Sequence, residues 1–330
     1  MFNFLRPRTC SFAALIIFLC FFTAGCNEAA QKENAVSLYV DAITLAETDQ
    51  QDLAIEKLQQ AVKNDPEFAI AYSLLGDIYF QQQNYPQSAS VLEKATQLNP
   101  WSIEDFENLG KVYRAMNDFT AAANAYIKAC QIDPENYPAH LGAAEAYYQS
   151  QDFENALQYS RAAIDINPVD SDIHKLLGDI YSAGKDNEMA IDAYKRALEI
   201  KGNDPAIMVP LAVSYLRDAQ YAVAGELLNN TIAIDEQNSD AWRHLGFASL
   251  RLNNIDSAIE QYSKAVQIAP EDYKNTKGLG VAYMMKSRSL ALGDPSAEEY
   301  KQKALQQWSR SLDMNPAQAQ LLKLYRKHSR

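Results

Sequence analysis

Few side chains in this 330-residue sequence have the types and spacing that catalysis or metal binding requires. The sequence has no phosphate-binding glycine loop, no G-x-S-x-G, no H-E-x-x-H and no paired C-x-x-C motif. Its 42 Asp and Glu residues are scattered and form no specific acid–base pair. His140 and His174 occupy equivalent places in a repeat, where we expect packing residues. We therefore expect no enzyme, no cofactor and no metal site.

The N-terminal segment has the pattern of a signal peptide. Arg6 and Arg8 precede an apolar run from Phe12 to Phe22, which is too short to span a bilayer as a permanent helix. Of the four cysteines, Cys10 and Cys20 would be removed with such a segment.

Residues 23–26, Thr-Ala-Gly-Cys, resemble the lipobox of bacterial lipoproteins, in which the cysteine is lipidated and becomes the first mature residue. The resemblance implies a lipoprotein signal peptide over residues 1–25, lipid attachment at Cys26, and a lipid-anchored tether over residues 26–34. Asn27 resembles the residue that follows the cysteine in lipoproteins sent to an outer membrane. We expect a location in the bacterial cell envelope, on the periplasmic face of the outer membrane; an ordinary cleaved signal is the alternative. Cys130 then remains as a single thiol, expected to be buried filler.

The rest of the chain repeats every 34 residues, which predicts a stack of helix pairs rather than one globular core. Two more columns of small residues recur at the same interval. Six of the eight units close with a proline, which ends the second helix of the unit. A tyrosine three residues after most of the first small sites is expected to lie beside them on one helical face. Pro210, inside a first helix, predicts a kink or a shortened helix. The first small sites are Ala42, Gly76, Gly110, Ala144, Gly178, Ala212, Gly246 and Gly280.

These columns resemble the tetratricopeptide repeat (TPR) family, whose pattern is W-x2-L-G-x2-Y followed by Ala, an aromatic residue, Ala and Pro. The match covers residues 35–316 in eight copies and is best in 69–100 and 239–270. The resemblance implies an all-α fold, a right-handed α-solenoid of about eight helix pairs. The eighth copy carries a 12-residue insertion around Leu290 to Glu298, which should make its helices project. Residues 317–330 are expected to form a C-terminal capping helix and basic tail.

Charge is unevenly distributed along the chain. Residues 26–272 hold 17 Lys and Arg against 38 Asp and Glu, whereas residues 273–330 hold 11 against 4. We attribute the acidic body to solubility, and interpret the basic end as a docking region for an acidic partner. No nucleic-acid partner is expected.

In TPR proteins the first helix of each repeat lines the concave face, and positions two, five, nine and twelve meet ligands. Mapped onto this sequence, the seventh and eighth repeats combine cations with apolar residues, as a peptide with acidic and hydrophobic side chains would require. The chaperone-type carboxylate clamp is not supported, because the ninth positions of the early repeats include no Asn. The predicted partner-binding groove comprises Arg217, Arg243, Phe247, Leu250, Arg251, Lys274, Lys277 and Met284.

The sequence favours a membrane-anchored scaffold or adaptor that binds protein partners in this groove to assemble or regulate an envelope complex. It resembles TPR lipoproteins of two kinds, the pilotins of type IV pilus assembly and adaptors for peptidoglycan hydrolases, and selects neither. The alternative is a glycan-binding or small-molecule-binding lipoprotein, with Tyr39, Phe80 and Tyr148 as a stacking platform.

Overall fold

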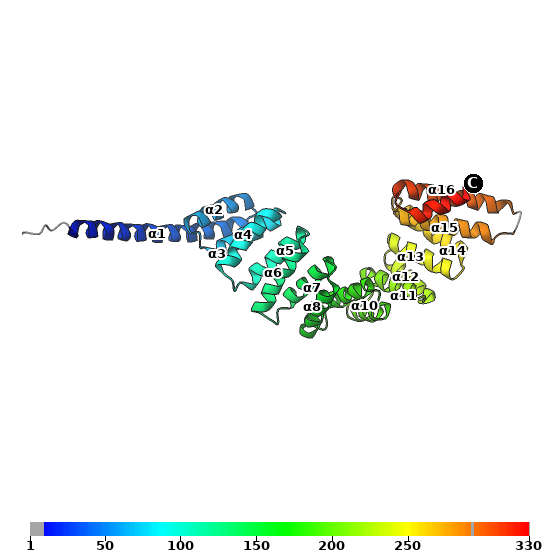
Figure 1. Ribbon diagram of the computed structural model, residues 1–330, viewed down its shortest axis with the longest axis horizontal. Coiled ribbons are helices and arrows are strands. Elements are labelled where there is room, and N and C mark those ends of the chain that lie inside the picture. Colours follow the sequence, from blue (N-terminus) through cyan, green and yellow to red (C-terminus); the bar gives the residue numbers. More distant parts are fainter. Residues whose placement is uncertain (1–9, 292–293, 330) are drawn as a thin grey trace, which may run out of the picture. The chain divides into compact units, whose positions relative to one another are not determined.

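The computed structural model describes residues 10–291 and 294–329, with side chains described from residue 28 onward. All regular structure in these residues is helical, and no strand occurs in them (Figure 1). Successive helices pair as the repeat predicts, from α1 with α2 to α15 with α16, and α17 follows the eighth pair. The all-α solenoid and its capping helix are thus confirmed. The helices are α1 (Cys10–Glu47), α2 (Gln51–Asn64), α3 (Ala69–Gln81), α4 (Tyr85–Leu98), α5 (Ile103–Ala115), α6 (Phe119–Ile132), α7 (Tyr137–Gln149), α8 (Phe153–Ile166), α9 (Ser171–Ala183), α10 (Asn187–Lys201), α11 (Pro205–Arg217), α12 (Tyr221–Ile234), α13 (Ser239–Arg251), α14 (Ile255–Ile268), α15 (Tyr273–Ser289), α16 (Pro295–Met314) and α17 (Ala319–His328).

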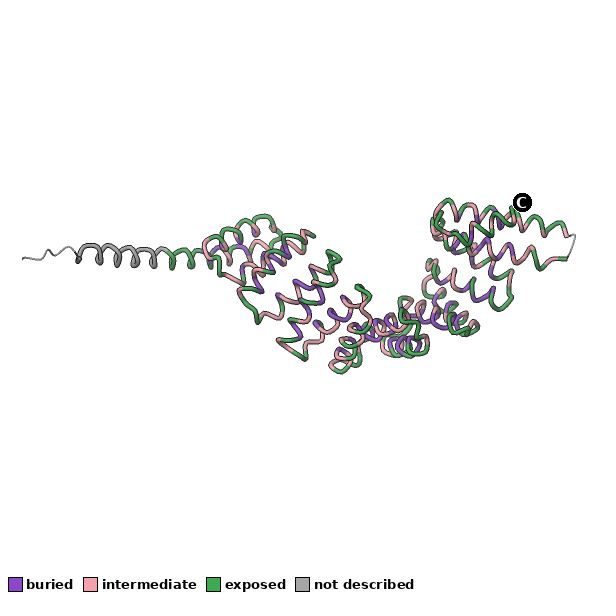
Figure 2. Tube along the Cα trace, in the orientation of Figure 1, coloured by how far each residue is buried: buried purple, intermediate pink, exposed green. Residues whose placement is uncertain are grey.

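The chain divides after Tyr159 into two compact units. Each unit buries the helix faces that carry the small columns, while the opposite faces stay exposed (Figure 2). In the first unit one core lies among Leu58, Leu75 and Ile78. In the second unit the largest core extends from α10 to α13. No unit has a single centre, because every helix pair covers only the apolar faces of its neighbours.

The glycines of the first small column are contact points between the two helices of a pair. A Cβ added to Gly110 would lie 2.7 Å from the Tyr126 ring, and one added to Gly178 would lie 2.5 Å from the Tyr194 ring. The side chain that fills the space over each of these glycines therefore comes from the second helix of the pair, and over Gly76 it is Leu92.

The turn within each of the first seven helix pairs uses the same backbone geometry. Its central residue has a φ between 57° and 64° although none of these residues is glycine: Asp49, Gln83, Asn117, Gln151, Lys185, Ala219 and Asn253. The next amide donates to a carbonyl five residues earlier, as from Asn84 to Tyr79 at 2.8 Å and from Gln220 to Tyr215 at 2.9 Å. This is the Schellman pattern, which satisfies the carbonyls at the end of the first helix.

The two histidines do pack at the joints between repeats. Nε2 of His140 lies 3.0 Å from the carbonyl oxygen of Pro134, and Nε2 of His174 lies 3.0 Å from that of Pro168. Trp242, at the equivalent place, donates from Nε1 to the Glu236 carbonyl at 2.9 Å. Each side chain ties the start of a first helix to the loop before it.

The eighth pair is longer than the others, as expected from its insertion. α15 has 17 residues and α16 has 20, whereas α13 and α14 have 13 and 14. α17 closes the stack with Leu321, which is 2 % exposed and packs with Trp308. α11 keeps 13 residues around Pro210, so of the two predicted outcomes the shortened helix does not occur, and the kink stays a prediction.

The predicted tether is helical, since α1 runs through residues 27–34. An α-helix rises only about 1.5 Å per residue, so this segment reaches less far than an extended chain would. The Cys26 side chain and residues 1–9 of the predicted signal peptide lie outside what is described. In the described part of the chain, no helix has both the length and the apolar character to cross a membrane.

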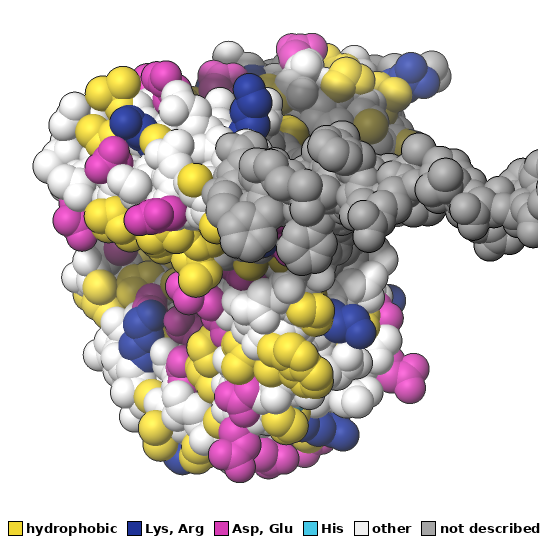
Figure 3. Space-filling model, turned by 90° about the vertical axis from the view of Figure 1, so that its left-hand side faces the viewer, with side chains coloured by type: hydrophobic (Ala, Val, Ile, Leu, Met, Phe, Trp, Pro, Cys, Tyr) yellow, Lys and Arg dark blue, Asp and Glu magenta, His cyan; other side chains and the backbone are white. Residues whose placement is uncertain are grey.

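On the face shown in Figure 3, charged side chains do not gather into one large patch. There, Asp and Glu side chains are scattered among hydrophobic and uncharged groups, with fewer Lys and Arg between them. This pattern fits the interpretation of the acidic body as a solubility feature.

Candidate binding pocket

A pocket of about 940 Å³ opens on the first helices of the last three repeats, inside the second unit. α13 contributes Arg243, His244, Phe247, Leu250 and Arg251. They lie on one helical face, because Phe247 is three or four residues from each of the others. The other walls come from α11, α12, α14 and α15, and carry Val213, Leu216, Arg217, Tyr221, Tyr262, Lys274, Lys277, Gly278, Val281 and Met285.

Seven of the eight predicted groove residues line this pocket. Met284 does not, because it is 6 % exposed and packs against Ala304 and Leu305 of the lengthened α16 and against Leu321 of α17. Met285 takes its place in the pocket. The prediction for Met284 was wrong because it used the repeat position alone. Only in the eighth repeat do a longer second helix and a capping helix cover the side chain at position twelve.

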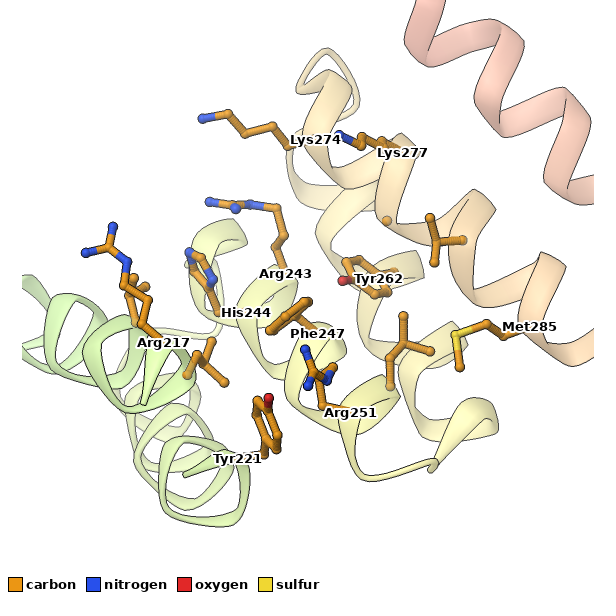
Figure 4. A pocket seen from close by; sticks show the side chains of 15 residues that line it. Arg217, Tyr221, Arg243, His244, Phe247, Arg251, Tyr262, Lys274, Lys277 and Met285 are labelled. Carbon is orange, nitrogen blue, oxygen red and sulfur yellow. The ribbon is translucent and has the colours of Figure 1, made fainter. Parts of the chain in front are cut away.

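The pocket is strongly cationic. Five Lys and Arg side chains line it, and none of the lining residues is Asp or Glu. The Lys and Arg side chains labelled in Figure 4 come from different helices and lie around the pocket, with the Phe247 ring among them. Lys274 and Lys277 form no ion pair with any described residue. An acidic ligand would therefore find positive charge that the protein has not already neutralised.

The arginines are held in place by different contacts. Arg217 donates from Nη1 to Ser182 Oγ at 2.6 Å, and Arg243 pairs with Asp240 one turn earlier on α13. The Arg251 guanidinium lies 4.6 Å from the centre of the Tyr221 ring. The buried Nε of Arg243 has no hydrogen-bond partner. Such preordered guanidinium groups suit paired hydrogen bonds to carboxylates.

His244 and Tyr262 also line the pocket, although the sequence did not predict them there. Burial, with a smaller contribution from the charge of Arg243, lowers the pKa of His244 to about 4, so its imidazole is neutral near pH 7. Burial raises the pKa of Tyr262, whose ring packs under Gly246 and Gly278. His244 lies one residue after Arg243, outside the four positions used for the mapping, and nothing in its spacing marked it.

The remaining candidates have structural environments. Cys130 is buried, and burial raises the pKa of its thiol to about 11, as a filler residue requires. In the described residues, no three or more His, Cys, Asp or Glu side chains are grouped to hold a metal ion. The rings considered for glycan stacking each have their own aromatic neighbour: Tyr39 with Phe68, Phe80 with Tyr85, and Tyr148 with Phe153.

Comparison with known proteins agrees with the helix pairs. Three family profiles match: a cytochrome c-type biogenesis protein H TPR domain over residues 161–276, and tetratricopeptide repeats over 113–180 and over 42–100. The protein is therefore an α-helical repeat protein of the interaction-scaffold kind. It belongs to the tetratricopeptide repeat family. No curated protein matches the chain.

Solved structures show the same fold at low sequence identity. The Cut9 and Hcn1 complex of APC/C matches with a TM-score of 0.59 and 16 % identity, covering 88 % of this chain and 55 % of that one. This chain thus spans about half of that longer protein. A TPR protein of Cytophaga hutchinsonii matches with a TM-score of 0.59 and 15 % identity, covering 75 % and 97 %. YrrB, described as a TPR protein with an unusual peptide-binding site, matches with a TM-score of 0.50 and 19 % identity, covering 61 % and 100 %.

Proposed function

We propose that this protein is a membrane-anchored scaffold whose pocket between α11 and α15 binds a partner segment bearing acidic and apolar side chains. The observation that carries the proposal is the surplus of positive charge. Five cations line the pocket, no carboxylate lines it, and the nearby carboxylate of Asp240 forms its ion pair with Arg243. Phe247, which is 38 % exposed, and Val281 offer apolar contact beside them. Exposed aromatic residues beside arginines are typical of interaction hot spots.

The anchoring part of the proposal rests on Cys26 and the residues before it. Lipidation there would attach the scaffold to the bacterial envelope, on the periplasmic face of the outer membrane, and the partner would belong to an envelope complex. Peptide binding is also the property named for YrrB, whose fold this chain shares.

The test reverses charge in the pocket. We expect Arg243→Glu combined with Lys277→Glu to abolish retention of specific envelope proteins when the full chain is used as bait in solubilised membranes. The expected loss is at least tenfold, because two attractive contacts become repulsive. Retained proteins would be quantified by mass spectrometry.

The matched control is Lys63→Glu combined with Lys128→Glu, two exposed lysines of the first unit. This variant changes the net charge equally but leaves the pocket intact, so it should retain the same proteins as the wild type. If the pocket variant has a normal thermal melt and still retains them, the pocket is not the binding site.

A further inference from the structure

A second, smaller hollow lies on the first unit, far along the chain from the cationic pocket. It has a volume of about 260 Å³ and is bordered by α1, α3 and α5. Three carboxylates, Asp77, Glu104 and Asp105, line it, and no Lys, Arg or His does. Tyr39, Ile70 and Leu74 provide an apolar wall.

Asp105 is the most informative of these residues. It is only 4 % exposed, yet its carboxylate accepts no hydrogen bond and forms no ion pair within the described part of the chain. Only its backbone amide is engaged, donating to Ser102 Oγ at 3.3 Å. The carboxylate therefore has little contact with water and no partner among the described side chains, and its remaining open surface borders the hollow. An incoming cation would supply the missing partner.

The pKa of Asp77 reflects the same excess of negative charge. Burial first, and then the charges of Glu104 and Asp105, raise the pKa of Asp77 to about 6. Lys111 lies near enough to oppose this shift, but its Nζ donates to Asn108 Oδ1 at 2.9 Å. Asn108 in turn donates to Asp77 Oδ1 at 2.8 Å. The cluster therefore has no cation bound directly to its carboxylates.

The shape of the hollow favours an organic cation over a metal ion. These carboxylates are not among any group of three or more side chains that could hold a metal, among the residues described. An arginine or lysine side chain has an alkyl stem, which would lie along Ile70 and Leu74, and a charged end for the carboxylates. Trp101, in the loop before α5, is 77 % exposed and offers further contact for a docked chain.

We propose that this hollow, bordered by Asp77, Glu104 and Asp105, binds an arginine or lysine side chain of a protein partner. The first unit would then recognise a basic residue, while the second unit carries the cationic pocket. This site is independent of the function proposed above, since the two pockets share no residue.

The experiment uses the full chain in detergent and a capped Leu-Arg-Leu peptide as probe, with Leu-citrulline-Leu as its uncharged counterpart. Calorimetry should show the arginine peptide binding at least tenfold more tightly. Asp105→Asn should weaken arginine binding at least tenfold, without lowering the melting temperature, because the substitution removes an unpaired buried charge. Glu135→Gln, an exposed carboxylate elsewhere in the unit, is the matched control and should bind as the wild type does.

The pH dependence gives a second measurement. Asp77 ionises as the pH rises through about 6, so arginine binding should strengthen between pH 5 and pH 7.5. The groups that act on Asp77 are Glu104, Asp105, Lys111 and Asn108. Asp77→Asn should remove the dependence, and it also serves as the test if Asp105→Asn does not fold.

Equal binding of the arginine and citrulline peptides would overturn the proposal, as would unchanged binding by a folded Asp105→Asn variant. Competition by millimolar Ca²⁺ or Mg²⁺ at constant ionic strength would instead assign the hollow to a metal. The pair Arg243→Glu and Lys277→Glu should leave arginine-peptide binding unchanged, which separates this proposal from the function of the cationic pocket.

Discussion

At the scale of single residues, the repeat depends on close approach between a small side chain and a ring. Gly178 lies where a Cβ would come within 2.5 Å of the Tyr194 ring, and Tyr194 is itself 1 % exposed and donates to Asp179 at 2.7 Å. The ring is held on several sides, so it cannot move aside without cost.

We therefore predict that Gly178→Leu lowers the free energy of unfolding by about 1 to 3 kcal/mol, the usual cost of overpacking. Gly184→Leu is the control, because Gly184 is exposed, has an ordinary helical φ of −71° and has no side chain within 4 Å. Urea unfolding followed by circular dichroism would compare them. Equal stability of the two variants would contradict the assigned register.

The sequence predicted well which residues share one face of a helix, and less well which of them neighbouring helices cover. Seven groove residues share one pocket because residues three or four apart keep one helical face wherever the helix lies. Met284 and Met285 differ by one position, and only the packing of α16 and α17 decides which is covered. The burial of Asp105 was missed for the same reason, since a carboxylate at a helix start is ordinarily exposed.

At the scale of elements, the turns within the helix pairs show a recurring strain. Ala219 adopts a φ of 57° between α11 and α12. In this region the Cβ of an L-residue crowds the backbone, and alanine lacks the polar side chain that helps Asn or Asp to adopt it.

We predict that Ala219→Gly raises the free energy of unfolding by about 0.5 to 1 kcal/mol, because relief of the crowding exceeds the entropy cost of glycine. Ala222→Gly, three residues later at an exposed site inside α12, should instead lower it by about 1 kcal/mol. Opposite shifts in the denaturant midpoint are the expected result. A loss at both sites would show that the turn carries no strain.

Element prediction succeeded where the signal was periodic. The small columns and prolines predicted all eight pairs and the cap, and the insertion correctly indicated longer helices in the eighth pair. For Pro210, only the predicted shortening was wrong. This proline lies within the first turns of α11, and the helix keeps its length around it, with Ser214 Oγ donating to the Pro210 carbonyl at 3.1 Å.

At the scale of the whole molecule, the cationic pocket of the second unit and the acidic hollow of the first unit have opposite charge. The formal net charge of the chain is −12, and the basic residues are concentrated towards the C-terminus. A scaffold with this distribution would select partners by charge as well as by shape, and long-range attraction would also speed their encounter.

The proposed anchor is tested at this scale too. If Cys26 is lipidated, Cys26→Ser should move the protein from the membrane fraction to the soluble fraction of a Gram-negative host, by at least tenfold on immunoblots. Cys130→Ser, at the buried thiol, is the control and should leave the fractionation unchanged. An unaltered distribution of the Cys26 variant would remove lipidation from the proposal.

The amino-acid sequence by itself determined the helix pairs, their number and the face on which the cations gather. It could do so because each repeat packs only on its neighbours, so the contacts that define the fold are close in sequence and recur with it. Only the tertiary structure decided which side chain of the second helix covers each glycine, which methionine reaches the pocket, and that Asp105 is buried without a partner. The burial of a side chain depends on how adjacent repeats are rotated and on which residues their second helices cover. Packing between helices decides this, and the spacing of residues along a single helix does not.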